Sequence, residues 1–296
     1  MIYYRLQKKC FYFATLFLFL TGFFSCSSAP KKPLEIFTSR NAAHAQIELA
    51  NSAISKNNYS TAQIHITEAW RLAVSCDDSD LRIRVLLCKG NALFNQGESN
   101  KAEEAWLLAL NEALVEKNSV MTSASQVHMA RVVLSKGKAE EARNLATESL
   151  STLKSEPVFT AQAWRVIGLS EKELGHSKEA ETAFLQAEKI HVKNNYLEEA
   201  AYDWYLIASS RSKAGQYALS IEALHRALEF DRRCENSFAI GMDWQSIGVV
   251  LEKSGNPEKA KEAYDRSAAI FTAAGLIENA KESIEKRKSI TNSPLN

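Results

Sequence analysis

The chain has 296 residues, 46% of them hydrophobic, with 36 basic against 35 acidic residues and a net charge of +1. A nearly neutral chain has no whole-molecule electrostatic attraction to nucleic acid. Its five cysteines show no CxxC spacing, so they indicate neither a zinc site nor a disulfide framework.

Residues 1–25 have the pattern of a secretory signal peptide. Three basic residues precede a continuous apolar run, Phe11–Phe24. This run of about fourteen residues is shorter than the roughly twenty that a membrane-spanning helix needs. The segment Phe23–Cys26 resembles a bacterial lipobox, in which a small residue before the cysteine permits cleavage and the cysteine sulfur is diacylated.

The lipobox resemblance implies that Cys26 is the lipidation site of an exported protein. Phe23 stands where leucine is usual, so the box is a relaxed one. An uncleaved anchor and an ordinary signal peptide with an incidental Cys26 are the alternatives. Residues 26–40 are predicted to form a flexible tether, because the segment 27–33 is small, polar and contains proline.

From residue 41 onward the chain repeats itself. Trp164, Trp204 and Trp244 are forty residues apart, and a glycine follows each of them eleven residues later. A small, a bulky apolar and a second small residue come next at fixed spacings. Three weaker copies precede these, so the first small residue recurs at six positions. They are residues 62, 102, 142, 180, 220 and 260, with steps of 40, 40, 38, 40 and 40.

This order of tryptophan, turn glycine and small residues resembles the tetratricopeptide repeat family over residues 41–275. The resemblance implies an all-α, right-handed superhelix (an α-solenoid) of about six helix-turn-helix repeats. Because the period exceeds the usual 34 residues, we expect longer helices. HEAT and armadillo arrays also have periods near forty, but they do not explain a turn glycine and a small residue in register. The predicted repeats are 43–81, 83–122, 123–160, 161–200, 201–240 and 241–275.

Within each repeat, residue size has a predicted packing role. The three tryptophans are interpreted as helix–helix packing residues rather than a ligand cage. Small residues, among them Gly168 and Gly248, are predicted to let paired helices approach closely. Residues 276–296 are predicted to form a capping helix and tail, with Ile277, Ala280 and Ile284 towards the array and a polar outer face. The predicted turn residues are Asn57-Asn58, Gly97, Gly137, Gly175, Gly215 and Gly255.

In the family, the first helices of the repeats line a concave binding surface. The resemblance places nine basic, amide and aromatic residues there. The basic residues among them form a track suited to an acidic or polar extended segment, or are ordinary solvated charges. A carboxylate clamp is not expected, because Ile47 and Leu87 stand where clamp lysines would be. The nine groove candidates are Asn51, Arg84, Asn91, Phe94, Arg131, Arg165, Lys172, Tyr202 and Tyr205.

The chain shows no linear signature of catalysis, since HExxH, GxSxG, GxxxxGK[ST] and GxGxxG are all absent. The six histidines lie in different units without metal-ligand spacing. Adjacent acids such as Glu198-Glu199 are interpreted as solvated faces of second helices and as helix-dipole partners. Cys76 and Cys88 could pair in an oxidising compartment, whereas two buried thiols are the preferred interpretation. We therefore expect no enzyme activity, cofactor or metal.

These observations predict a non-enzymatic adaptor of the bacterial cell envelope. It would be anchored to a membrane through Cys26, on the periplasmic face in a Gram-negative cell, and would bind envelope proteins or extended peptides but not nucleic acid. One alternative is an accessory component of a solute transporter that holds a small hydrophobic ligand in a groove or pore. A structural role in envelope assembly is the third. An open concave face with polar edges would favour polypeptide binding, and a closed apolar tunnel would favour the ligand.

Overall fold

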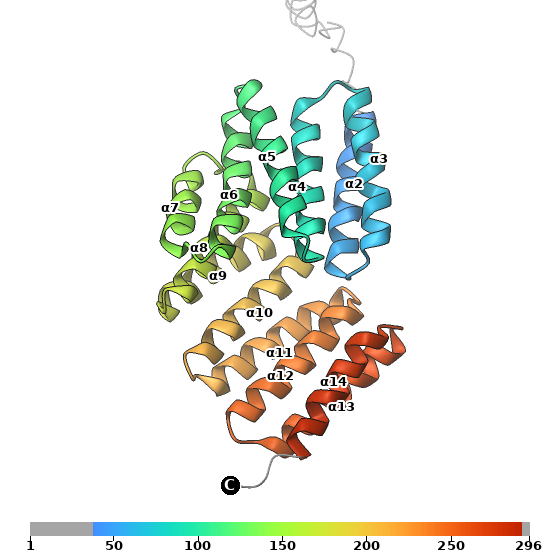
Figure 1. The fold of residues 1–296 in the computed structure, drawn as a ribbon, viewed down its shortest axis with the longest axis vertical. Helices are drawn as coiled ribbons and strands as arrows, with labels where there is room; N and C mark the ends of the chain where they lie inside the picture. The colour runs from blue at the N-terminus through green and yellow to red at the C-terminus, as the bar shows by residue number, and fades with distance from the viewer. Residues whose placement is uncertain (1–37, 292–296) are drawn as a thin grey trace, which may run out of the picture. The chain divides into compact units, whose positions relative to one another are not determined.

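The computed structural model describes residues 38–291, and this part of the chain contains thirteen helices and no strand (Figure 1). The predicted all-α repeat architecture is confirmed. From α4 to α13 consecutive helices pack as pairs, α14 packs on α13, and α2 and α3 share one apolar cluster. The helices are α2 (Thr38–Ser55), α3 (Tyr59–Ser75), α4 (Ser79–Asn95), α5 (Ser99–Val115), α6 (Ser119–Ser135), α7 (Ala139–Leu150), α8 (Pro157–Glu173), α9 (Ser177–Lys193), α10 (Leu197–Lys213), α11 (Tyr217–Arg233), α12 (Ser237–Lys253), α13 (Pro257–Ala273) and α14 (Ile277–Thr291).

The forty-residue period consists of two long helices and two short turns. Between α3 and α13 every helix except α7 has 17 residues, and three residues join most neighbouring helices. The 12-residue α7 and a longer connection after it account for the 38-residue step. The first helices start one turn before the predicted repeat boundaries: α4 at Ser79 rather than 83, and α12 at Ser237 rather than 241. Trp164, Trp204 and Trp244 are the eighth residues of α8, α10 and α12, so the repeat signature leaves the first two turns of these helices unmarked.

The middle residue of each three-residue turn has a left-handed backbone. The five predicted turn glycines have φ between +75° and +88°, and Asn57 has φ +58°. Glycine adopts this region without the steric penalty that a Cβ imposes. Turns between repeats use other residues in the same conformation, namely Asp77, Lys117, Asn195 and Glu235. Short turns of one shape keep successive helices antiparallel and in register.

In three repeats, a glycine of the first helix meets an aromatic ring of the second. A Cβ built on Gly168 would lie 2.5 Å from the Phe184 ring, and one on Gly248 would lie 2.6 Å from the Tyr264 ring. Gly90 has the same relation to Trp106, at 2.1 Å. In the fifth repeat, the corresponding buried residues are Ala208 and Leu224. Glycine therefore accompanies an aromatic ring, and alanine accompanies a smaller aliphatic side chain.

The repeat tryptophans pack at helix–helix contacts. Trp164 is partly buried against the apolar cluster formed by α4 to α9, and Trp204 and Trp244 against the cluster of α9 to α13. The guanidinium of Arg266 covers the Trp244 ring at 4.6 Å. This placement agrees with the packing role expected of the three residues.

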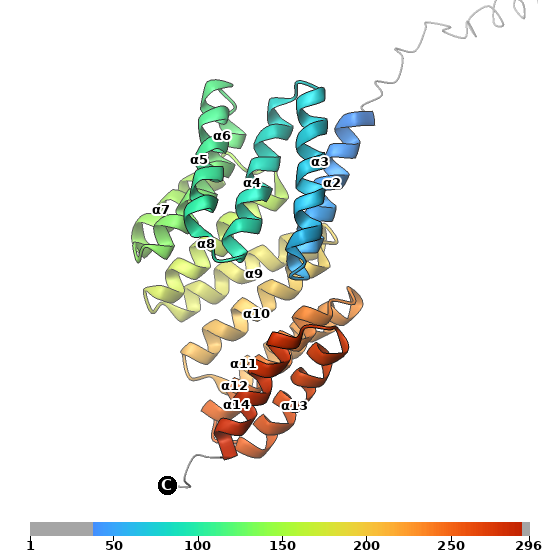
Figure 2. The ribbon, with the colours of Figure 1, turned by 45° about the vertical axis from the view of Figure 1, so that its right-hand side comes forward.

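The array curls until its first repeat contacts its fifth and sixth (Figure 2). Ser52 and Ser55, at the end of α2, donate hydrogen bonds of 3.2 and 2.7 Å to the carboxylate of Glu198 at the start of α10. Asn236, which caps α12, donates through Nδ2 to the backbone oxygen of Ser55 at 3.3 Å. These bonds join residues 143 to 181 positions apart, so they close one face of the curl.

The capping helix α14 is rotated relative to the predicted orientation. Ala280 and Ser283 are buried, whereas Ile277 and Ile284 are 51% and 39% exposed. The hydroxyl of Ser283 shares a 2.9 Å hydrogen bond with Ser267 of α13. The prediction that both isoleucines face the array is therefore wrong. The face of α14 that packs on the array includes this polar contact, which an apolar pattern does not register.

Two buried carboxyl groups meet between α11 and α12. Asp231 and Asp243 are 4% and 2% exposed, and they interact closely enough for each to influence the pKa of the other. Burial raises the pKa of Asp231 to about 7, and burial together with the charge of Asp231 raises the pKa of Asp243. Arg232 opposes the shift at Asp243, and Glu198 reinforces it at Asp231. The pair lies near Asn236, and so near the contact that closes the curl.

We predict that Gly168→Ala destabilises the protein by about 1–3 kcal/mol, because the added methyl group would displace the Phe184 ring. Adding Phe184→Leu should recover most of the loss, since the double variant copies the Ala208 and Leu224 pair. Urea unfolding of the two single variants and the double variant measures this coupling. Equal stability of Gly168→Ala and the parent protein would contradict the contact.

We predict that stability falls as pH rises from about 4, the pKa of unfolded aspartate, to about 7. Because the pKa values of this pair are raised in the folded protein, the native state binds protons there more tightly than the unfolded chain, so the loss is on the order of 2–4 kcal/mol. Asp243→Asn should flatten this dependence and be more stable than the parent protein at pH 8. Measuring the free energy of unfolding at pH 5 and pH 8 tests this prediction. The control is Asp77→Asn, which removes a carboxylate whose side chain is 99% exposed.

Candidate functional site

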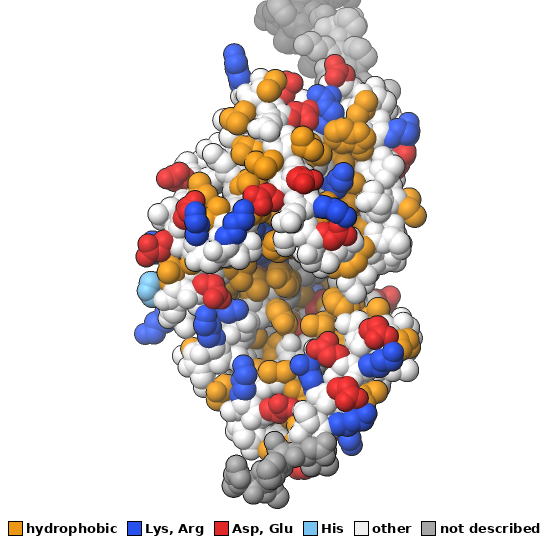
Figure 3. Space-filling view, in the orientation of Figure 1, with side chains coloured by type: hydrophobic (Ala, Val, Ile, Leu, Met, Phe, Trp, Pro, Cys, Tyr) orange, Lys and Arg blue, Asp and Glu red, His pale blue; other side chains and the backbone are white. Residues whose placement is uncertain are grey.

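The first helices of the repeats line the inner face of the curl. α4 contacts α6 and α6 contacts α8, each across the second helix that separates them in sequence. Figure 3 shows the array hollowed between α4 and α10, with hydrophobic side chains on the floor of the hollow and charged side chains around it. We define the inner face by Asn91, Arg131, Arg165, Glu199 and Tyr202, which interact across these helices.

Arg165 of α8 is tied to α10 by several bonds. Its Nε lies 2.5 Å from Oδ1 of Asp203, Nη1 pairs with the Glu199 carboxylate, and Nη2 donates to the Glu199 backbone oxygen at 2.7 Å. Oδ2 of Asp203 is 2.6 Å from Nδ1 of His191, so the network continues to α9. Burial lowers the pKa of Arg165, but the two carboxylates outweigh it and raise the pKa overall. Arg165 therefore links repeats four and five through charged hydrogen bonds.

Two other predicted cations of the groove also have partners within the protein. Nε of Arg84 lies 2.8 Å from Asp80, and its Nη2 lies 3.0 Å from Glu156. Lys172 donates to the Ser209 hydroxyl at 2.8 Å, and burial lowers its pKa. Arg84 is thus neutralised internally, as Arg165 is. The predicted basic track is largely occupied by partners within the array.

Arg131 of α6 differs from the other two arginines among the predicted groove residues. Its Nη1 donates to Oδ1 of Asn91 at 2.6 Å, and its guanidinium lies 4.6 Å from the ring centroid of Phe94 and 5.0 Å from that of Trp106. Burial, with a contribution from the charge of Arg165, lowers its pKa to about 10. Arg131 remains charged at neutral pH in an aromatic setting.

The remaining predicted groove residues supply aromatic and amide groups. Tyr202 is 49% exposed, stacks on Tyr205 with ring centroids 6.1 Å apart, and lies beneath the guanidinium of Arg165 at 4.9 Å. Partial desolvation by the surrounding helices raises the pKa of Tyr202, so its phenol stays neutral. Oδ1 of Asn51 accepts a 3.3 Å hydrogen bond from the Cys88 thiol. The inner face therefore combines accessible aromatic surface with fixed polar groups.

Sequence reasoning missed the acids of this face. Glu198-Glu199 was expected on a second helix with solvated side chains, but both residues lie in the first turn of α10, a first helix. Glu198 binds α2 and Glu199 binds Arg165. The available signal was the spacing of Glu199 and Asp203, which places two carboxylates on one helical face.

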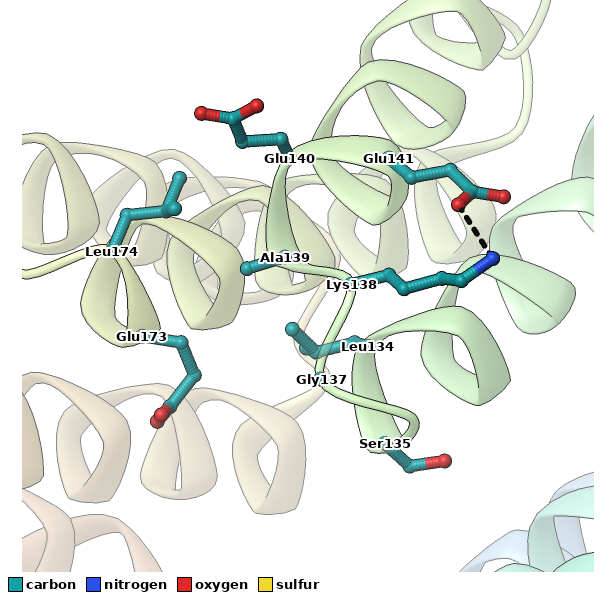
Figure 4. Close-up of a pocket in the computed structure, with 9 residues that line it drawn as sticks. All are labelled: Leu134, Ser135, Gly137, Lys138, Ala139, Glu140, Glu141, Glu173 and Leu174. Atoms are coloured by element: carbon teal, nitrogen blue, oxygen red, sulfur yellow. Dashed lines mark ion pairs between the residues drawn. The ribbon is translucent and has the colours of Figure 1, made fainter.

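An open pocket of about 730 Å³ lies at the edge of the array, where the turn between α6 and α7 meets the end of α8 (Figure 4). Among its lining residues, Lys138 pairs with Glu141 at 3.1 Å. The carboxylates of Glu140 and Glu173 point away from each other (Figure 4). With no set of reactive groups aimed at one point, this pocket suggests no chemistry.

Within residues 38–291, no three His, Cys, Asp or Glu side chains are grouped as a metal ion would require. No helix in that range is both long and apolar enough to cross a bilayer. Cys76, Cys88 and Cys234 are free thiols; Cys76 is exposed, contrary to the expected buried pair. Cys26 lies outside the described residues.

Comparison with known proteins identifies the fold. Residues 244–272 match the tetratricopeptide repeat model. Similar solved structures include a Rap protein complexed with Competence and Sporulation Factor, with TM-score 0.57 and 16% identity over 86% of this chain and 76% of that one. The apo form of RapI has TM-score 0.58 and 12% identity over 84% and 70%. BtubC from P. vanneervenii has TM-score 0.54 and 14% identity over 79% and 92%. A search of curated proteins gives no match.

Proposed function

We propose that this array, which carries a tetratricopeptide repeat at residues 244–272 and has the fold of such repeats throughout its described helices, binds an extended segment of a partner protein on its inner face. The observation that carries the proposal is the half-exposed Tyr202, stacked on Tyr205 beside Arg165 inside the curl. Aromatic side chains held rigidly beside fixed polar groups offer contact area at low entropic cost. The array then serves as a non-enzymatic interaction scaffold.

The inner face suits a polypeptide better than a small hydrophobic ligand. Such a ligand needs a concave site lined mainly by apolar side chains. Here Glu199, Arg165 and Arg131 stand among the aromatic residues, and the 730 Å³ pocket lies at the edge of the array. An extended peptide presents backbone amides and carbonyls that such polar groups can bind. A transporter accessory with a hydrophobic ligand is therefore the second candidate.

The similar structures support interaction as a role for this fold. A Rap protein with TM-score 0.57 to this chain is complexed with Competence and Sporulation Factor. At 16% identity the likeness concerns the fold, so we infer a shared capacity to hold a partner and no shared partner.

We also infer that the protein is exported and anchored to a membrane of the bacterial envelope through Cys26. The apolar run Phe11–Phe24 and the relaxed lipobox support this. Eleven residues separate Cys26 from Thr38, where α2 begins, and a fully extended segment of this length would span at most ~40 Å. The anchor would hold the array within reach of proteins at or near the membrane.

A photo-crosslinking amino acid at position 202 should form an adduct with a polypeptide in intact cells, because Tyr202 faces the interior of the curl. The matched control places the same amino acid at Ile64, which is 68% exposed on the second helix α3. Electrophoresis and mass spectrometry identify the adducts. Protein adducts from position 64 alone, or only small molecules at position 202, would overturn the proposed function.

Cys26→Ala should abolish fatty-acid labelling and release the protein from membranes, because the thiol that carries the lipid is lost. Cys10→Ala, at the other cysteine of the N-terminal segment, is the control and should behave as the parent protein. Metabolic labelling followed by membrane fractionation measures both effects. Labelling that persists in Cys26→Ala would rule out the lipobox.

A further inference from the structure

Arg131 has hydrogen-bonding capacity that the array does not use. Its Nη1 is bonded to Asn91 and lies 3.4 Å from Nδ1 of His128. No hydrogen bond from the described residues involves its Nε or Nη2, and neither nitrogen is sealed from solvent. These two nitrogens form one edge of the guanidinium group, and the distance between them matches the distance between the two oxygens of a carboxylate.

The charge of Arg131 is also unmatched. Of the three arginines among the predicted groove residues, Arg84 and Arg165 each pair with two carboxylates, whereas no carboxylate among residues 38–291 lies within 4.0 Å of Arg131. The Glu199 carboxylate, which acts on Arg131 through space, is already bound to Arg165. The charge of Arg131 is therefore not balanced by a neighbouring carboxylate, and it is available to an external anion.

The walls around Arg131 would strengthen an ion pair. Phe94 and Trp106 stack on the guanidinium and hold its plane in place. Burial, reinforced by the charge of Arg131, keeps the pKa of His128 well below its usual value, so this histidine is neutral and accepts through Nδ1. An ion pair gains strength beside apolar walls because less water screens it.

We propose that Nε and Nη2 of Arg131 bind a single carboxylate of the polypeptide held on the inner face, either an Asp or Glu side chain or the C-terminal group. This inference rests on the proposed function and specifies the chemistry of the partner. A carboxylate fits better than a phosphate, since one unmatched cation balances one negative charge. Glu48 and Glu199 act on each other across this face and would repel a dianion.

The test uses full-length protein in detergent micelles and a displayed library of random peptides about ten residues long. Binders of the parent protein should share one Asp or Glu. When this acid is changed to Asn or Gln, the peptide should bind the parent protein at least about tenfold more weakly, because a hydrogen-bonded ion pair typically contributes that much affinity. The same change should hardly affect binding to Arg131→Gln. Arg226→Gln, at an exposed arginine of the second helix α11, should bind as the parent protein does.

A stability measurement separates recognition from folding. Without peptide, Arg131→Gln should melt at or above the temperature of the parent protein, because an unmatched charge leaves the inner face. A lower melting temperature together with equal loss of binding for acidic and neutral peptides would show a structural role and overturn the inference. Arg131→Lys should give intermediate affinity, because it keeps the charge without the paired donors.

Other outcomes would contradict either the carboxylate site or the proposed function. Peptides that bind without any acid requirement overturn the carboxylate site and leave the proposed function standing. Binding that inorganic phosphate inhibits more strongly than acetate overturns the assignment to a carboxylate. A parent protein that selects no peptide, and forms no polypeptide adduct at position 202, overturns the proposed function and this inference together.

Discussion

The close contact between the two helices of each repeat is the constraint on which the rest of the structure depends. Where Gly168 meets Phe184 there is no room for a Cβ, and where Ala208 replaces the glycine a smaller leucine replaces the ring. Matching residue sizes in this way keeps the helix spacing similar from repeat to repeat. Similar repeats stacked at similar angles must curl, and the curl brings Ser55 to Glu198.

The curl determines the properties of the inner face. Side chains that would be solvated on an isolated repeat face one another across the hollow, so burial acts on charged groups such as Arg165 and Arg131. Most of these charges are balanced by ion pairs within the array. The tyrosines and the free edge of Arg131 remain available, and in the proposed binding these few groups, rather than total charge, would determine specificity.

Much of the architecture follows from sequence because it depends on local residue size. The positions of turn glycines, small residues and bulky residues sufficed for the repeat count, the helix pairs and the packing role of the tryptophans. The helix starts were harder to predict from the sequence, because the first turn of each first helix carries no signature residue. The orientation of α14 was missed because the face that packs on the array includes the hydroxyl of Ser283, and apolar periodicity does not register such a group.

The sequence by itself determined that this chain is an all-α array of repeats with a lipobox-like N-terminal segment, and it located the nine groove candidates. Only the tertiary structure decided which of those residues are free to bind a partner. Arg165 and Asp203 are 38 positions apart, and Ser55 and Glu198 are 143 apart. Whether such residues meet depends on the curvature summed over several repeats. The spacing within one repeat does not contain that curvature, so the availability of Arg131 and the engagement of Arg84 and Arg165 could not be read from the sequence.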